Sequence, residues 1–137
     1  MSCEKDIKII KNGQILSENG GNGMISKLEN LPVKQRRGEN GETSLVLTDL
    51  ADFPGRSPKL KMFSRVQLLP GQKLAYHEHH GESEQYFILS GTGVYNDNGT
   101  EIPVGPGCVT CTRSGSGHGL ENTGEEPIVF VALIIVD

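Results

Sequence analysis

The sequence contains no tryptophan, and aromatic residues make up only 5% of its 137 residues. Aliphatic side chains must therefore supply most of any hydrophobic core, and the length is that of one domain rather than two. Glycine is frequent instead, with 18 residues, and 7 prolines accompany it. Such a density of turn-forming residues favours many short strands over long helices.

The chain also lacks a strongly basic region. Its formal net charge is −4, and its one basic cluster consists of Lys34, Arg36 and Arg37. A nucleic-acid-binding face requires a broader basic surface, so we expect no nucleic-acid partner. We interpret the cluster as solvated loop residues. The alternative is an anion contact that reaches over the rim of a pocket.

Cysteine is scarce, with three residues, which argues against a disulfide framework and favours a reducing compartment. Cys108 and Cys111 lie three positions apart in an expected strand, so their side chains should point to opposite faces. We therefore predict that they are strand residues and not a metal-binding or redox pair.

Long hydrophobic runs are absent as well. The longest run, Ile128–Val136, has nine residues, whereas a membrane-spanning helix needs about 18. The N-terminal residues include acidic side chains and show no apolar segment of a signal peptide. The sequence thus predicts a cytoplasmic protein with no membrane partner.

Composition divides the chain near residue 43. Residues 1–43 are rich in glycine, asparagine, glutamate and lysine, and we expect an N-terminal arm with one or two short strands, including one around Ile7–Ile10. Residues 44–137 carry the apolar alternation that is typical of strands, and we expect them to form the barrel domain.

Eight segments of the second part are expected strands, because each is an apolar or alternating run bounded by turn residues. They are Ser44–Leu50, Lys59–Leu69, Tyr76–His79, Glu84–Ser90, Gly93–Asp97, Thr100–Val104, Val109–Arg113 and Ile128–Val136. Asn98 and Gly99 suit the two left-handed positions of a type I′ hairpin turn. No window shows a persuasive helical period, so the pattern indicates an all-β sandwich or barrel.

Four polar residues form a candidate metal site. His77 and His79 are two positions apart, so in a strand both imidazoles lie on one face. Glu84 follows a short turn and can lie across from them, and a barrel can return His118 to the same interior. Imidazole and carboxylate bind Mn, Fe, Ni or Zn, and four protein ligands can leave two positions open.

The neighbouring polar residues have plainer interpretations. His80 should face away from the candidate site, and Glu78 and Glu82 should be solvated. Tyr86 shares a face with the candidate carboxylate, which leaves core packing and pocket lining equally open. Ser64 stands among inward-facing apolar residues and is a weaker candidate for a polar pocket residue.

The spacing around the candidate site resembles the first motif of the cupin superfamily. That motif runs Gly, five residues, His, one residue, His, four residues, Glu, six residues, Gly. It is met by Gly71, His77, His79, Glu84 and Gly91. Such a match arises by chance on the order of 10⁻⁷ per start position, given ordinary residue frequencies.

A second stretch resembles the second cupin motif. Gly107, Gly115, His118 and Asn122 stand at its offsets, whereas Arg113 takes the place of its proline. Proline there would stiffen the loop that carries the histidine, so this departure bears on loop rigidity and not on the candidate ligand. Together the two motifs cover roughly residues 59–136.

The resemblance implies a double-stranded β-helix, the jelly-roll barrel of cupins, with one divalent metal ion inside one end. It also implies metal-ligand roles for four residues: His77, His79, Glu84 and His118. The motif glycines would be turn residues with unusual φ, and Asn122 would be a structural hydrogen-bonding residue.

Fold alone does not decide function. Among similar cupins, the small oxalate-decarboxylase-like proteins are the best analogue, and they suggest a metal-dependent enzyme that acts on a small carboxylate or other oxygen-rich molecule. The reaction would be decarboxylase-like or dioxygenase-like, and no separate general base is evident in the sequence. The alternative is a non-catalytic cupin that binds a small molecule.

We also expect a homodimer. Ile128–Val136 is apolar on both faces, and such a strand must be covered on both sides. One barrel of this size has limited surface with which to cover both faces, so a second copy of the chain is the expected cover.

Overall fold

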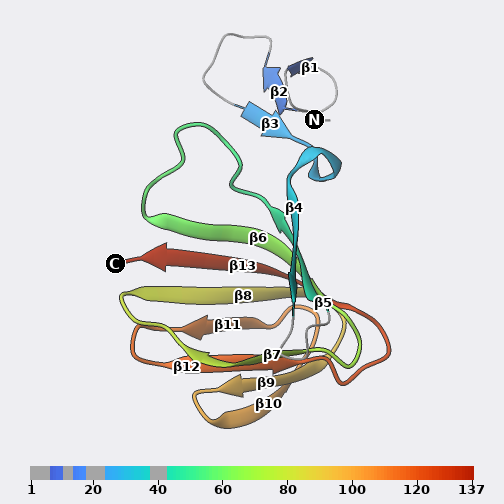
Figure 1. The fold of residues 1–137 in the computed structure, drawn as a ribbon, viewed down its shortest axis with the longest axis vertical. Helices are drawn as coiled ribbons and strands as arrows, with labels where there is room; N and C mark the ends of the chain where they lie inside the picture. The colour runs from blue at the N-terminus through green and yellow to red at the C-terminus, as the bar shows by residue number, and fades with distance from the viewer. Residues whose placement is uncertain (1–6, 11–13, 18–23, 38–42) are drawn as a thin grey trace.

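Strands make up nearly all of the regular structure (Figure 1). The computed structural model describes residues 7–10, 14–17, 24–37 and 43–137. In these ranges the only helix is a 3-10 turn, η1, at Leu28–Asn30, and no described helix is long and apolar enough to cross a bilayer. The prediction of an all-β chain is confirmed. The strands are β1 Ile7–Ile10, β2 Gln14–Ser17, β3 Met24–Ser26, β4 Val33–Arg37, β5 Thr43–Asp49, β6 Leu60–Leu68, β7 Lys73–Glu78, β8 Glu82–Ser90, β9 Gly93–Asp97, β10 Thr100–Val104, β11 Val109–Thr112, β12 Gly117–Glu121 and β13 Ile128–Val136.

Two antiparallel sheets form the barrel. One has six strands in the order β11-β8-β13-β6-β5-β4, and the other has four in the order β10-β9-β12-β7. Neighbours in each sheet are often distant in sequence, as expected for the predicted double-stranded β-helix. β1, β2 and β3 form a separate three-stranded sheet, at the top of Figure 1.

The core lies between the two large sheets and is mainly aliphatic, as the composition predicts. Three aromatic residues nevertheless lie in it, namely Tyr86, Tyr95 and Phe130. The Tyr86 ring packs against Phe130 with centroids 4.6 Å apart, and it stacks on His118 at 4.9 Å. The core therefore extends directly to the candidate site.

The strand β13 has two different faces. Ile128, Phe130 and Ala132 point into the core and are buried, whereas Val131 and its outward neighbours are half-buried. On the same outer face Phe87 of β8 is 45% exposed. The described part of the chain thus covers one apolar face of β13 and leaves the other at the surface.

Several turns form as the sequence predicts. Asn98 and Gly99 have φ of 49° and 101°, which confirms the hairpin between β9 and β10. The motif glycines also have positive φ, at 78° for Gly71, 85° for Gly91, 88° for Gly107 and 89° for Gly115. At Gly91 a Cβ would additionally overlap the carbonyl oxygen of Pro127, so no other residue fits there without a shift of the backbone.

Asn122 joins three segments of backbone, as the resemblance implies. Its buried amide donates hydrogen bonds to the carbonyls of Leu68, at 2.9 Å, and Glu126, at 2.8 Å. Its Oδ1 accepts a hydrogen bond from the amide of Gly124 at 3.0 Å. These bonds hold the end of β12 close to the end of β6.

The sequence did not predict β12, because glycines at 117 and 119 resemble a turn. The structure gives their physical reason. A Cβ at Gly119 would lie 3.0 Å from the carbonyl oxygen of Leu74, and one at Gly117 would overlap the ring of Tyr76. Gly119 thus marks a close approach of neighbouring backbone, whereas Gly117 leaves room for an aromatic side chain.

The basic cluster is exposed to solvent, as predicted, but the prediction of a loop is wrong. Lys34, Arg36 and Arg37 do not lie in a loop but on β4, which pairs with β5 at the edge of the six-stranded sheet. Their polar side chains hid the strand, since an exposed edge strand shows little hydrophobic alternation.

Candidate metal centre

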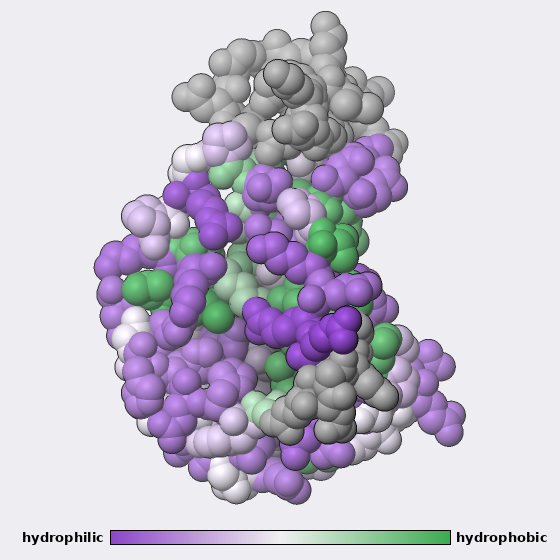
Figure 2. Space-filling view, viewed as in Figure 1, coloured by the Kyte–Doolittle hydropathy of each residue, from purple (hydrophilic) through white to green (hydrophobic). Residues whose placement is uncertain are grey.

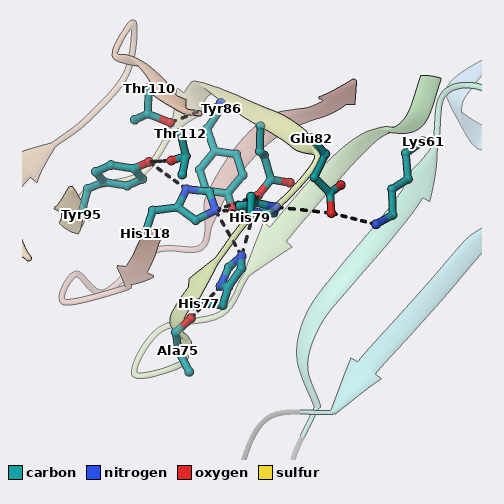
Figure 3. Close-up of polar contacts among 11 residues, drawn as sticks. Lys61, Ala75, His77, His79, Glu82, Tyr86, Tyr95, Thr110, Thr112 and His118 are labelled. Atoms are coloured by element: carbon teal, nitrogen blue, oxygen red, sulfur yellow. Dashed lines mark hydrogen bonds and ion pairs between the residues drawn. The ribbon is translucent and has the colours of Figure 1, made fainter. Parts of the chain in front are cut away.

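The structure brings together the four residues that the sequence predicts as metal ligands. His77 lies on β7, His79 directly follows that strand, Glu84 lies on β8 and His118 on β12. One ligand atom from each lies within 4.8 Å of those of the other three. We call this group the His₃Glu cluster. Figure 3 shows its three imidazoles converging from different directions.

Strand pairing explains the convergence. In the four-stranded sheet His118 of β12 is directly opposite His77 of β7. The amide of His79 donates to the carbonyl of Ser116 at 3.0 Å, and the amide of Gly115 donates to the carbonyl of His79 at 2.7 Å. These bonds hold the loop before β12 even though Arg113 takes the motif proline's place.

The spacing of the donor atoms fits a single cation. Oε1 of Glu84 lies 2.8 Å from Nε2 of His118, 3.2 Å from Nε2 of His79 and 3.9 Å from Nε2 of His77. The Nε2 atom of His118 lies 3.1 Å from that of His79 and 3.2 Å from that of His77. A metal ion about 2.0–2.2 Å from each donor requires neighbouring donors about 3 Å apart.

The outward nitrogens of two histidines have partners that suit metal binding. The carbonyl of Ala75 can only accept, so Nδ1 of His77, 2.8 Å away, donates to it and Nε2 presents its lone pair to the cluster. Nδ1 of His118 lies 2.8 Å from the hydroxyl of Tyr95, which lies 2.9 Å from Oγ1 of Thr112 (Figure 3). When His118 donates a hydrogen bond through Nδ1, the Tyr95 hydroxyl can accept it and donate its own hydrogen bond to Oγ1 of Thr112.

Glu82 was predicted to be solvated, and that prediction is wrong. Its side chain is 15% exposed, and its Oε1 lies 3.7 Å from Nδ1 of His79 and 2.9 Å from Nζ of Lys61. The other oxygen, Oε2, is buried without a hydrogen-bond partner. β8 begins two residues earlier than expected, which turns Glu82 toward His79 instead of toward solvent.

Sequence reasoning missed Tyr95 and Thr112 as supports of the site. Tyr95 lies on a strand that was predicted correctly, but nothing local connects it to a histidine 23 positions further along the chain. His80 is exposed beside Glu78, as predicted. Cys111 is an exposed residue of β11, as predicted, whereas Cys108 packs against the core and lies just before that strand.

The charges in the cluster favour a cation. Burial acts to raise the pKa of Glu84, but contacts with His118 and His77 outweigh it and lower that pKa to about 2. Burial lowers the pKa of His118. The Glu84 carboxylate raises the pKa of His77, with burial opposing the rise. A charged carboxylate beside a buried neutral imidazole is a suitable donor set for a divalent ion.

A cavity of about 550 Å³ adjoins the cluster and has a mixed lining. His77, His79 and Glu84 contribute to its wall, and so do Tyr86 and Ser64. Tyr86 is therefore both a core and a pocket residue. On the outside, Figure 2 shows mostly hydrophilic residues on the face in view, with apolar residues visible between them.

Comparison with protein families gives one match over more than half of the chain. Residues 64–135 match the family model described as "Cupin domain". A curated protein of Thermotoga maritima named "Oxalate-binding protein" is 36% identical over 119 residues, which are 85% of this chain and 97% of that protein.

Solved structures give the same result for the fold. The crystal structure of a predicted oxalate decarboxylase from Thermotoga maritima is 33% identical, covers 83% of this chain and 100% of its own, and has a TM-score of 0.76. A cupin-superfamily sugar phosphate isomerase from Silicibacter pomeroyi is 22% identical over 81% of this chain and 74% of its own, with a TM-score of 0.67. The second likeness concerns the fold alone.

The low pKa of Glu84 predicts how the metal-free protein responds to acid. The folded carboxyl binds fewer protons than the unfolded one, whose pKa is 4.5. Its contribution to stability is therefore present above pH 4.5 and is lost as pH falls toward 2. Urea unfolding of EDTA-treated protein between pH 6 and pH 3 should show a shallower loss of stability for Glu84→Gln than for wild type. If the free energy of unfolding depends on pH equally in both proteins, the low pKa of Glu84 is not the source of the acid sensitivity.

Removing one hydroxyl should weaken metal binding without unfolding the barrel. Tyr95→Phe deletes the group that contacts Nδ1 of His118, and loss of such an outer partner typically costs 10–100-fold in metal affinity. Competition with a chelator measures the affinity. Tyr76→Phe is the matched control, because its hydroxyl contacts Asn98 at the surface, at 3.5 Å. The prediction fails if the two variants bind metal equally well.

Proposed function

Because the chain belongs to the cupin family, we propose that its His₃Glu cluster holds one divalent metal ion and that a small carboxylate binds at that ion. The observation that carries this proposal is the convergence of four donor atoms at the wall of a cavity. The relative named for oxalate binding supports a carboxylate as the ligand.

A divalent ion at this cluster would supply positive charge to a ligand oxygen and activate it as a Lewis acid. The donor set accepts manganese, iron, nickel or zinc, and metal supply often decides among them. His77, whose side chain is 40% exposed, marks the open side of the cluster, where a ligand can approach. His118, at 0% exposure, closes the opposite side.

We propose further that the bound carboxylate is transformed, in a decarboxylase-like or dioxygenase-like reaction. The alternative is binding without turnover, and the name of the Thermotoga protein favours it. Tyr86 and Ser64 line the cavity wall, and their hydroxyl groups are of the kind that orients a substrate oxygen.

Calorimetric titration tests both parts of the proposal. Oxalate or glutarate should bind once per chain to protein loaded with Mn, Fe, Ni or Zn, and EDTA treatment should abolish the binding. Assays for carbon dioxide release and dioxygen uptake on the same samples separate turnover from binding. The proposal is contradicted if neither acid binds or reacts with any of the four metals.

We also propose a cytoplasmic location. The chain has three cysteines, and the described pair, Cys108 and Cys111, forms no disulfide. A reducing compartment is compatible with such thiols, whereas secreted domains of this size usually carry disulfides.

The outer face of the six-stranded sheet is the basis for a proposed homodimer. Val109, Phe87 and Val131 stand side by side across β11, β8 and β13, and Val109 is 63% exposed. A second copy of the chain that covers this row would bury the side chains that one barrel leaves at the surface.

Light scattering measures the predicted dimer directly. The wild type should have twice the mass of the chain at micromolar concentration, and Phe87→Glu should shift the protein toward monomer. Ile102→Glu, which places the same charge on an exposed residue of the other sheet, should leave the dimer intact. A wild type that is monomeric at high micromolar concentration would refute the dimer.

A further inference from the structure

The cavity beside the His₃Glu cluster carries a charge opposite to that of the whole chain. The chain has a formal net charge of −4. The cavity wall nevertheless holds more cationic side chains than carboxylates. The cations are Lys34, Arg36, Arg56 and Lys61, and the carboxylates are Asp49, Glu82 and Glu84. A metal ion would add further positive charge, so the site should attract anions.

At least two of these cations have carboxylate partners in the cavity wall. Nζ of Lys61 lies 2.9 Å from Oε1 of Glu82, and Nη1 of Arg56 lies 3.8 Å from Oδ2 of Asp49. Their charges are therefore largely matched by neighbouring acids. Among the described residues Lys34 forms no such ion pair.

The register of β4 places Lys34 and Arg36 on the cavity side of the sheet. Lys34 is directly opposite Leu47 of β5, and Arg36 is directly opposite Leu45. Residues directly opposite in an antiparallel pair share a face. Both leucines are buried and line the cavity, so the two cationic side chains extend from the same face.

The β4 cations and the cluster belong to one cavity. Lys34 and Arg36 line the same wall as His77, His79 and Glu84.

The cavity is larger than oxalate needs, and part of its wall is apolar. The cavity holds about 550 Å³, within the usual range for ligands larger than oxalate. Leu45, Leu47 and Leu74 contribute to the wall together with the β4 cations and the cluster residues. A ligand that fills this space would carry a carbon chain with an anionic group at each end.

We propose that Lys34 and Arg36 form a second anion-binding site, so that the preferred ligand is a linear dicarboxylate longer than oxalate. One carboxylate binds at the His₃Glu cluster, the carbon chain packs on the leucine wall, and the second carboxylate contacts β4. This inference rests on the proposed function, because the first carboxylate is placed at the metal ion.

Pairs of acids that differ only at the far end provide the test. Glutarate and adipate are compared with pentanoate and hexanoate, and oxalate is titrated as a ligand that engages the cluster alone. In the metal-loaded wild type the diacids should bind about tenfold more tightly than the monoacids of equal length, as expected for one charge-assisted contact at an exposed rim. The double variant Lys34→Gln/Arg36→Gln should lose this difference and keep its affinity for oxalate within about twofold.

A second double variant controls for the loss of two positive charges. Arg65→Gln/Lys73→Gln removes the same charge from residues outside the cavity wall and should retain the diacid preference. Equal binding of diacids and monoacids by the wild type overturns the inference, and so does a preference that survives in the Lys34/Arg36 variant. In either case oxalate binding would leave the proposed function standing, whereas the absence of binding by any of these acids would overturn both.

Discussion

The structure depends on holding four electron-rich atoms within a few ångströms of one another inside a barrel. Three imidazole nitrogens and one carboxylate oxygen converge, and lone pairs at such distances repel unless a proton or a metal ion lies between them. The β12 strand makes the convergence possible, because its glycines let it approach β7 closely and so place His118 opposite His77. The Ala75 carbonyl and the Tyr95 hydroxyl then fix the orientation of the two imidazoles.

Much of the fold and the whole cluster could be predicted from the sequence, because both rest on local periodicity and fixed spacing. The i, i+2 spacing of His77 and His79 and the left-handed preference of Asn98-Gly99 are local signals. The errors arose where long-range pairing decides the outcome. Glu82 is turned inward by its contacts with His79 and Lys61, and the basic residues of β4 lie on a strand only because β5 pairs with them.

The cavity wall combines two groups of side chains that come from different parts of the chain. The His₃Glu cluster lies in the region that matches the family model, at residues 64–135. The β4 cations, in contrast, precede that region and face the cavity through the pairing of β4 with β5. In our proposal the cluster binds one carboxylate and β4 binds the other, so part of the ligand preference arises outside the region that matches the family model.

The most direct test of the account is the metal content of the chain, measured by plasma mass spectrometry on protein purified without an affinity tag. The account predicts close to one equivalent of a first-row divalent metal per chain, and little in His118→Ala, whose imidazole is the most buried of the cluster. A wild type that stays far below one equivalent after reconstitution, or a variant that retains its metal, would contradict the account.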